Sequence, residues 1–382
     1  MPVIGIVAGE ASGDLLGAHL IQALKPHLPQ ARFVGIGGPR MEAAGLQVLF
    51  PMNKLAVRGY VEVMRHYFEI VGIRRQLAGY FLRERPACFI GVDAPDFNLD
   101  LERRLKSAGI RTVQYVSPQI WAWRSERMHQ IKRAVDKMLT VFPFEGPLYE
   151  AAQIPVAYVG HPLADMLGDF PGMHAAREQL RLPATARIVA LLPGSRVSEL
   201  QQMADLFVAT AAEIAAGDPE VLFLAPLVNL ETRELFEAAL YRRGVPSLNL
   251  TMLFGHAHEA MAAADVVLVS SGTATLEAAL LRRPMVITYK MPRISWWIMN
   301  RRLHQAYAGL PNILAGEFVV PEILQDEATP DNLAQAVLNL MSDVTVRSRI
   351  DARFSELLGE LRQNTAQKVA QALLPMVNGG AA

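Results

Sequence analysis

The chain has 382 residues, and at about 150 residues per domain this length predicts two or three domains. Hydrophobic residues make up 51% and charged residues 19%, which is typical of an ordered globular protein. Lys and Arg number 37, as do Asp and Glu, so the formal charge is zero and we expect no nucleic-acid partner. The single cysteine, Cys88, excludes an intrachain disulfide and a cysteine metal cluster.

Missing motifs exclude further kinds of site. The nine histidines show no HExxH or other metal-ligand spacing, and no GxSxG nucleophile elbow occurs. We therefore expect no metal site and no cofactor. The N-terminal segment leads straight into an apolar strand, and no run of about 18 apolar residues occurs, so we expect neither a signal peptide nor a membrane-spanning helix.

The first strand–turn–helix unit carries carboxylates at its turn. We expect a strand at Val3–Ala8 and a helix at Leu15–Leu24. The turn contains Gly9, Glu10, Ala11, Ser12, Gly13 and Asp14. Glu10 and Asp14 would repel a diphosphate, and the turn lacks both GxGxxG and the P-loop pattern. It favours a hydroxyl-bearing ligand or a catalytic role.

A long amphipathic segment, Val57–Leu82, follows a second expected strand at Arg32–Ile36. One helical face carries Tyr60, Met64, Tyr67, Phe68, Val71, Leu77 and Phe81. The segment is flanked by Arg58, Arg65, Arg74, Arg75, Arg83 and Arg85. Broken by Gly59, Gly72 and Gly79, it resembles an interfacial segment that dips into a lipid leaflet. The alternative, which the pattern alone slightly favours, is ordinary core helices packed on a sheet.

A second carboxylate-bearing turn follows the expected buried strand Cys88–Val92. Ligands of open α/β sheets bind at the carboxyl ends of strands, which is where Asp93 and Asp96 lie. Asp93 is closest to the strand end and is the candidate general base. Asp96 could instead cap the following helix.

Tryptophans follow the next expected strand, Thr112–Val116. Trp121 and Trp123 stand beside Arg124 on a loop, which suits stacking on a sugar or covering a lipid. The alternative is packing beneath the loop. Further short strands are expected at Leu139–Val141 and Tyr158–Val159.

The second half opens with a candidate phosphate site. The polar stretch Asp165–Leu182 looks like a domain boundary, and a strand at Ile188–Leu192 and a helix at Glu199–Ala216 follow it. The turn between them contains Gly194, Ser195 and Arg196. The glycine and serine expose backbone donors, and the arginine supplies a planar charged fork for a diphosphate.

A related turn follows the apolar run Val266–Val269. It contains Ser270, Ser271, Gly272 and Thr273, and a helix at Ala274–Leu281 comes next. Unpaired N–H groups and the positive end of the helix dipole suit a phosphate there, and Glu277, about one turn further on, could bind a ribose diol. The alternative is a plain capped turn.

The remaining second-half elements complete an alternating pattern. Strands are expected at Val221–Ala225, Leu248–Leu253 and Met285–Tyr289, with a helix at Gly255–Ala263. Trp296, Trp297, Arg301 and Arg302 form an interfacial signature. Asn312 lies where a loop residue can reach a polar ligand.

This pattern predicts an α/β protein made of two doubly wound Rossmann-like domains facing across a cleft. We expect residues 1–165 and 166–344 to form the domains, and helices within 345–382 are candidates to pack back on the first.

Six motifs together carry a family resemblance. They are AGEASGD (Ala8–Asp14), GVDAPDFN (Gly91–Asn98), YVSPQIWAWR (Tyr115–Arg124), LLPGSR (Leu191–Arg196), SSGTATLE (Ser270–Glu277) and LPNILAG (Leu310–Gly316). In this order the set resembles lipid-A-disaccharide synthases, inverting glycosyltransferases of the two-domain GT-B class. The SPQIWAWR block departs slightly from the expected SPSVWAWR form.

The resemblance implies transfer of 2,3-diacylglucosamine from UDP to the 6-hydroxyl of 2,3-diacylglucosamine 1-phosphate in lipid A biosynthesis. It also implies peripheral association with phospholipid on the cytoplasmic face of the inner membrane, and a homodimer is left open. Asp93 would be the base. The donor would be held by Gly194, Ser195, Arg196, Ser271, Gly272, Thr273, Glu277 and Asn312. The acceptor side would be shaped by Glu10, Ser12, Gly13 and Asp14.

Two other classes fit parts of the pattern. A UDP-sugar 2-epimerase on the same architecture would bind the same nucleotide but would need no lipid acceptor. The third hypothesis is a non-catalytic protein that binds a nucleotide sugar or a lipid. The carboxylates at the strand ends weigh against it.

Overall fold

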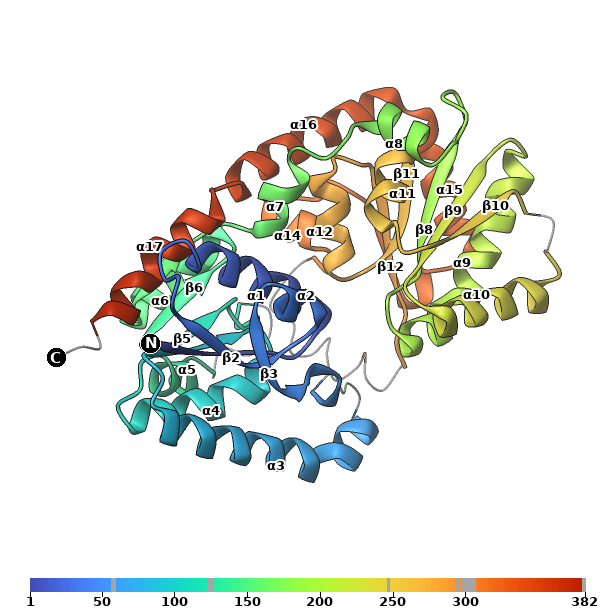
Figure 1. The fold of residues 1–382 in the computed structure, drawn as a ribbon. Helices are drawn as coiled ribbons and strands as arrows, with labels where there is room; N and C mark the ends of the chain where they lie inside the picture. The colour runs from blue at the N-terminus through green and yellow to red at the C-terminus, as the bar shows by residue number, and fades with distance from the viewer. Residues whose placement is uncertain (56–59, 122–126, 246–247, 293–295, 297–306, 380–382) are drawn as a thin grey trace. The chain divides into compact units, whose positions relative to one another are not determined.

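The computed structural model describes residues 1–55, 60–121, 127–245, 248–292, 296 and 307–379, and for residues 60–67 only the backbone (Figure 1). Contacts divide the chain into two compact units. The first comprises Met1–Asp165 with Glu360–Ala382, and the second comprises Met166–Gly359. Each unit is built around its own parallel sheet, as expected for two doubly wound domains.

The first unit contains a seven-stranded parallel sheet in the order β3-β2-β1-β4-β5-β6-β7. Its strands are β1 (Val3–Ala8), β2 (Arg32–Gly37), β3 (Leu46–Pro51), β4 (Cys88–Val92), β5 (Thr112–Tyr115), β6 (Lys137–Thr140) and β7 (Val156–Tyr158). Its helices are α1 (Ala11–Leu24), α2 (Pro39–Ala43), α3 (Tyr60–Glu84), α4 (Pro95–Ser107), α5 (Met128–Ala134), α6 (Gly146–Ala151) and α17 (Thr365–Asn378). Short apolar runs such as β4 are buried along their whole length, because helices cover both faces of a parallel sheet.

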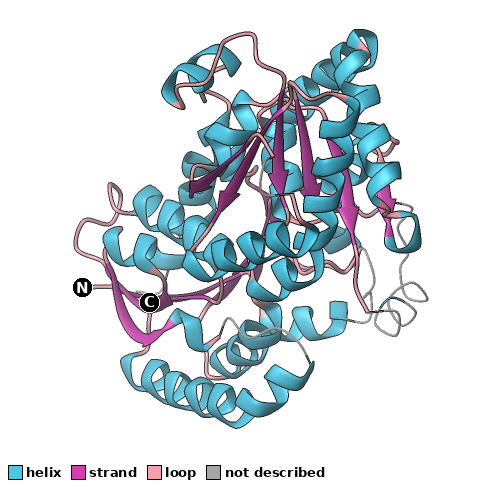
Figure 2. Cartoon of the chain, turned by 90° about the vertical axis from the view of Figure 1, so that its right-hand side faces the viewer, coloured by secondary structure: helices cyan, strands magenta, loops and turns pink. Residues whose placement is uncertain are grey.

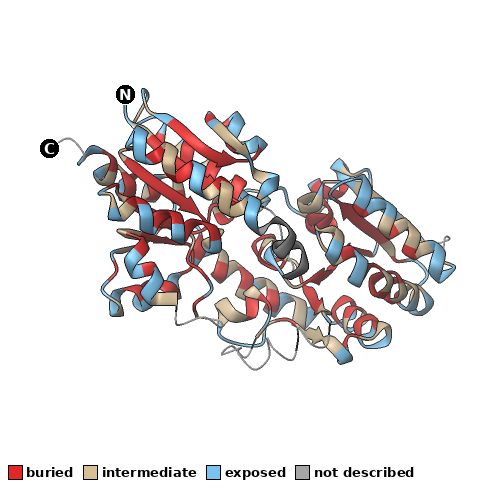
Figure 3. Cartoon of the chain, turned by 90° about the horizontal axis from the view of Figure 1, so that it is seen from below, coloured by how far each residue is buried: buried red, intermediate tan, exposed pale blue. Residues whose placement is uncertain are grey.

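The second unit contains a six-stranded parallel sheet in the order β10-β9-β8-β11-β12-β13. Its strands are β8 (Ile188–Leu192), β9 (Leu222–Leu227), β10 (Leu250–Phe254), β11 (Val266–Ser270), β12 (Met285–Tyr289) and β13 (Glu322–Leu324). Its helices are α8 (Met173–Gln179), α9 (Val197–Gly217), α10 (Leu230–Arg243), α11 (Ala257–Ala263), α12 (Thr273–Leu280), α14 (Leu310–Ala315) and α15 (Pro330–Ser342). Figure 2 shows helices alternating with the strands, and Figure 3 shows the central strands coloured as buried.

Two helices cross the boundaries between the units. α7 (Pro162–Leu167) spans the division after Asp165, and α16 (Val344–Leu361) spans the division before Glu360. The return of the chain to the first unit therefore begins at Glu360, later than the expected position 345. α17 is held there by Asp165, whose carboxylate accepts hydrogen bonds from the N–H groups of Asn364 at 3.1 Å and Thr365 at 2.6 Å.

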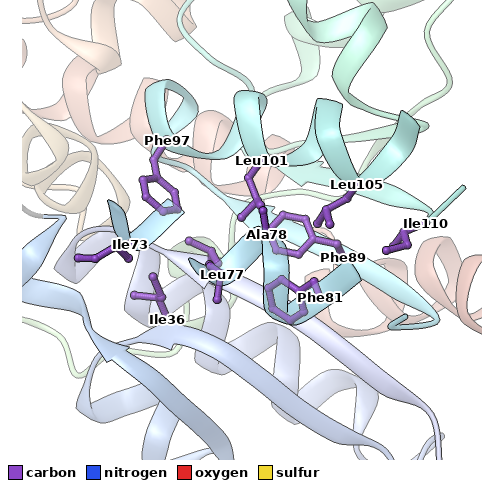
Figure 4. Close-up of a cluster of buried hydrophobic side chains, with 11 residues drawn as sticks. Ile36, Ile73, Leu77, Ala78, Phe81, Phe89, Phe97, Leu101, Leu105 and Ile110 are labelled. Carbon is purple, nitrogen blue, oxygen red and sulfur yellow. The ribbon is translucent and has the colours of Figure 1, made fainter. Parts of the chain in front are cut away.

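The amphipathic segment forms one helix, α3, which runs through Gly72 and Gly79 without the predicted breaks. Its C-terminal half belongs to the core, because Ile73, Leu77 and Phe81 are buried against β4 and α4 (Figure 4). Phe81 makes an edge contact with Phe89 at 5.3 Å between ring centroids. For Leu77 and Phe81 the core-helix alternative is therefore confirmed, and the interfacial interpretation does not apply to them. Phe68, nearer the N-terminus of the helix, is 84% exposed.

Candidate active site

Both sheets reverse their strand order between two central neighbours. In the first unit the reversal falls between β1 and β4, and in the second between β8 and β11. Connections that leave such a pair pass to opposite faces of the sheet, so the turns diverge and open a crevice at the carboxyl ends. The four turns singled out in the sequence are the four that flank these two switch points.

In the first unit, Glu10 and Asp93 directly follow the paired strands β1 and β4. Ala8 lies opposite Val92 in the register, so the two turns begin side by side. A Cβ at Gly9 would lie 3.0 Å from the Cβ of Ala94, which shows how closely the two turns approach. The structure thus brings the Glu10 turn and the candidate base to one edge of one sheet.

Asp93 has a strained backbone that its surroundings hold firmly. Its φ is +52° and that of Ala94 is +42°, in the left-handed region that residues other than glycine rarely adopt. The Asp93 N–H donates to the carbonyl of Tyr115 at 2.9 Å. Its carbonyl oxygen accepts from the side-chain amides of Asn98 and Gln114, each at 2.9 Å. Strain held in this way is typical of functional positions.

Asp96 does not cap the following helix. The N-cap of α4 is Ala94, and the exposed Asp96 carboxylate pairs with Arg127. Because its side chain points to this neighbour, Asp96 is the weaker of the two candidates for chemistry.

Asp14 has a different role from the one predicted. Helix α1 begins at Ala11, so Ser12, Gly13 and Asp14 lie in its first turn and not in the preceding loop. The carboxylate of Asp14 is buried and accepts hydrogen bonds from the N–H groups of Gly38 (2.8 Å), Arg40 (3.0 Å) and Met41 (3.0 Å). It caps α2 and is no longer a candidate for acceptor contact, whereas Glu10 and Ser12 are partly exposed.

The turn after β8 is organised by Glu199, a residue that the sequence reasoning did not single out. Its carboxylate accepts from the N–H groups of Ser195 (2.9 Å) and Arg196 (3.2 Å) and pairs with the Arg196 guanidinium at 2.8 Å. Gly194 has φ +139°, and a Cβ there would lie 2.5 Å from the Cβ of Glu199. The carboxylate of Glu199, in the first turn of α9, thus occupies the backbone donors of Ser195 and Arg196 that were predicted for a phosphate, so phosphate binding at this turn stays a prediction.

The turn after β11 is hydrogen-bonded to the turn after β8 through Ser270, whose hydroxyl donates to the carbonyl of Pro193 at 2.8 Å. The N–H of Ser271 continues the sheet ladder to Thr288 at 3.0 Å, and its hydroxyl donates to the carbonyl of Ala308 at 3.1 Å. Ser271 is therefore a positioning residue here and its N–H is not a phosphate donor. The helix begins at Thr273, and among the residues that the structure describes no atom lies within 4 Å of the point that a Cβ on Gly272 would occupy.

Glu277 has a partner that the sequence did not reveal. Its Oε2 lies 2.9 Å from Nε2 of His258, which comes from α11. The His258 ring in turn contacts Phe170 edge-on at 6.0 Å between centroids. The imidazole of His258 thus fixes the orientation of the Glu277 carboxylate through one of its two oxygens. Glu277 lies one turn into α12, as predicted.

Asn312 differs from its predicted role. It is fully buried, and its amide donates to the carbonyl of Val320 at 2.9 Å and to Glu322 at 2.8 Å. Its oxygen accepts from the N–H groups of Val319 (2.9 Å) and Val320 (3.0 Å). With both donors and both lone pairs engaged, the side chain closes a loop and leaves no atom for a donor substrate.

The tryptophan loop is anchored in the first unit by Trp121. Its Nε1–H donates to Glu145 at 3.3 Å, and its ring contacts Phe144 edge-on at 5.2 Å. Burial raises the pKa of Glu145 to about 7. For Trp121 the packing alternative holds. The other predicted interfacial residues, Trp123, Arg124, Trp297, Arg301 and Arg302, lie outside the described residues, as does Arg58.

The described part of the chain bears on the metal and membrane-span expectations. Within it, no group of three or more His, Cys, Asp and Glu side chains is arranged to hold a metal ion. Buried His161 has its pKa lowered to about 4 by desolvation, which describes a neutral core imidazole. Over the same residues, no helix has the length and apolar character needed to cross a bilayer.

Solved structures of low sequence identity define the class of fold. HepE of Anabaena, solved with UDP and glucose, is 14% identical with a TM-score of 0.59, and the match covers 99% of each chain. The calicheamicin glycosyltransferase CalG4 is 14% identical with a TM-score of 0.60 over the whole of both chains. UDP-GlcNAc 2-epimerase from Neisseria meningitidis is 12% identical with a TM-score of 0.66, covering 98% of this chain and 100% of that one. The chain has the GT-B fold, which transferases and epimerases share.

Sequence comparisons separate those classes. The family model for lipid-A-disaccharide synthetase matches residues 4–374. Lipid-A-disaccharide synthases from Methylobacillus flagellatus and Dechloromonas aromatica are 55% and 54% identical, covering 99% and 98% of this chain and 100% and 98% of the relatives. The chain belongs to the lipid-A-disaccharide synthetase family. The resemblance seen in the six motifs is confirmed, and the epimerase alternative gains no support.

The structural role of Asn312 is testable by replacing it with alanine. Because Asn312→Ala leaves buried N–H groups and Glu322 without their partner, we expect the free energy of unfolding to fall by about 2 kcal/mol or more. Exposed Asn339→Ala is the matched control and should change it by less than about 0.5 kcal/mol. Urea unfolding followed by circular dichroism measures both. An Asn312→Ala variant as stable as the control would restore Asn312 to the candidate ligand contacts.

Proposed function

We propose that this chain transfers 2,3-diacylglucosamine from UDP to the 6-hydroxyl of 2,3-diacylglucosamine 1-phosphate, forming the β-1,6-linked lipid A disaccharide 1-phosphate and releasing UDP. The observation that carries the proposal is the family match over residues 4–374. The carboxylates at one switch point and the Arg196 turn at the other support it, because inverting transfer needs a base and a stabilised leaving group.

In the proposed reaction, Asp93 takes the proton from the acceptor 6-hydroxyl. That oxygen forms a bond to the anomeric carbon from one face as the bond to the UDP oxygen breaks on the other, which inverts the centre. Glu10 and Ser12 would shape the acceptor side near this base. The rigid backbone of Asp93 supports the role, because a base contributes only where its geometry is fixed.

The departing diphosphate would be held in the second unit. Supporting this are the Arg196 guanidinium, which carries a positive charge at the turn after β8, and the N–H groups of Gly272 and Thr273 at a helix N-terminus. Glu277, oriented by His258, would accept hydrogen bonds from the ribose. Asn312 and Ser271 make no direct contact in this proposal, because their polar groups are hydrogen-bonded within the protein.

We further propose peripheral association with phospholipid through α3, on the cytoplasmic face of the inner membrane. Supporting this are the exposed Phe68 ring and a hollow of about 540 Å³ whose lining includes Leu49, Phe50 and Tyr80 beside Arg75 and Arg83. Apolar surface next to arginines suits acyl chains next to anionic headgroups. The buried half of α3 would hold this surface on the core.

The role of Asp93 is tested by Asp93→Asn, because asparagine adopts a positive φ readily and so keeps the turn. We expect the rate of disaccharide formation from defined donor and acceptor to fall by about 10²-fold or more, with UDP affinity unchanged. Asp96→Asn in the same turn is the control and should stay within about threefold of wild type, because its carboxylate faces Arg127. Near-normal turnover by Asp93→Asn would remove it from the role of base. Turnover of UDP-sugar without acceptor would instead indicate an epimerase.

The lipid surface is tested by vesicle flotation with Phe68→Ser. We expect the floated fraction to fall by about threefold or more, because an exposed ring that enters the leaflet is lost. Phe254→Ser, which changes a ring that is 63% exposed in the second unit, is the matched control and should float like wild type. Arg75→Ser with Arg83→Ser should weaken flotation only with anionic vesicles. Equal flotation of Phe68→Ser and wild type would contradict the proposed surface.

A further inference from the structure

Three polar side chains lie fully buried beside Gly91, directly behind the Asp93 turn. They are Asn98 and Glu102 on α4 and Gln114 on β5, each with no exposed surface. Polar groups are buried at this depth only where their hydrogen bonds are satisfied or where they serve the site above them.

The two amide nitrogens in this cluster have an assigned task. Nδ2 of Asn98 donates to the carbonyls of Asp93 (2.9 Å) and Val7 (3.3 Å). Nε2 of Gln114 donates to the carbonyls of Asp93 (2.9 Å) and Val116 (3.3 Å). Each amide uses both of its N–H groups on carbonyls, so its orientation is fixed and its oxygen must face the other way.

The oxygens on that other side lack donors. Among the described residues, Oδ1 of Asn98, Oε1 of Gln114 and both carboxyl oxygens of Glu102 are buried without a hydrogen-bond partner. Oε1 of Glu102 and Oε1 of Gln114 lie 2.4 and 2.5 Å from the point that a Cβ on Gly91 would occupy, so they are close neighbours. Two unpartnered acceptors that lie this close in a buried place favour a proton between them.

We propose that Glu102 is an uncharged carboxylic acid at neutral pH and donates its O–H to the amide oxygen of Gln114. It is thereby a positioning residue for Asp93, because the amide it fixes holds the Asp93 carbonyl. The protonation state of Glu102 is independent of the proposed function. Its positioning role rests on that function, because the function makes Asp93 the base.

The surroundings of Glu102 favour the neutral acid. Burial raises the pKa of Glu102 well above its ordinary value, against the smaller opposing effects of the Gly91 peptide and of Lys106. Lys106 itself pairs with Asp136 at 3.1 Å. The nearby thiol of Cys88 is also neutral, since burial raises its pKa to about 12. An ionised carboxylate at this depth would need a dedicated cation.

The consequence for the reaction is a matter of geometry. Asp93 and Ala94 both have positive φ, and the two amides restrain the peptide that joins them. Without the donor from Glu102, the Gln114 amide could rotate and release the Asp93 carbonyl. The carboxylate would then be misplaced while the proposed nucleotide contacts, which belong to the second unit, persisted, so kcat should fall and UDP affinity should not.

Infrared spectroscopy of the intact protein tests the protonation state directly. A protonated carboxylic acid has a C=O stretch distinct from that of a carboxylate. We expect this band in wild type, and its loss in Glu102→Gln, at a pH well above the value of about 7 to which burial raises Glu145. Glu145→Gln is the matched control and should leave the band in place. Identical spectra for wild type and Glu102→Gln would overturn the proposal.

Kinetics of the same variants test the positioning role. Glu102→Gln keeps a donor of similar shape and should retain kcat within about threefold, whereas Glu102→Leu should lower kcat by about tenfold or more with UDP affinity unchanged. A loss of about tenfold in Glu102→Gln, or normal kcat in Glu102→Leu, would overturn it. If Glu102→Leu does not fold, the infrared band of the wild type and the kcat of Glu102→Gln test the proposal. If Asp93 is not the base, the Asp93→Asn variant would keep near-normal turnover, and the infrared band of Glu102 would be unchanged.

Discussion

The reversal of strand order in each parallel sheet is the constraint on which the rest of this protein depends. A parallel sheet ends all its strands at one edge, and only at the reversal do neighbouring turns move apart. Pairs β1/β4 and β8/β11 are the two places where this happens. Helix N-termini and short polar side chains lie at these turns without any need for a long loop.

The chain uses buried polar side chains to shape these turns. Asp14 caps α2 beside the first switch point, and Asn312 closes a loop in the second unit. Glu199 holds the turn after β8. Each of these groups is hydrogen-bonded within the protein itself, so the structure gives it a role in shaping the turns. The ligand contacts that we propose are therefore fewer than the motifs suggested, with Asp93, Arg196 and Glu277 foremost among them.

The strand ends could be predicted from the sequence because they depend on local pattern. Short apolar runs such as Cys88–Val92 and Met285–Tyr289 identify buried parallel strands, and the small or charged residues after them identify the turns. The position of Asp93 followed from this rule alone. So did the two-unit division, since alternating strands and helices restart after the polar stretch near Asp165.

The remaining features depend on partners distant in the chain. The carboxylate of Asp14 meets the N–H of Gly38, 24 residues away, and Gln114 meets the carbonyl of Asp93, 21 residues away. No local pattern distinguishes a capping aspartate from a ligand-binding one. The α3 segment is a second example. Its apolar helical face is equally compatible with a protein core and with a membrane surface, and the packing of Phe81 on Phe89 in the structure assigns its C-terminal half to the core.

The most direct measurement is a crystal structure of the protein with bound UDP. We expect the diphosphate between the turns after β8 and β11, within hydrogen-bond distance of the Arg196 guanidinium and the N–H groups of Gly272 and Thr273. The ribose should lie at the Glu277 carboxylate. A diphosphate bound at any other edge of the second sheet, or in the first unit beside Glu10, would contradict it.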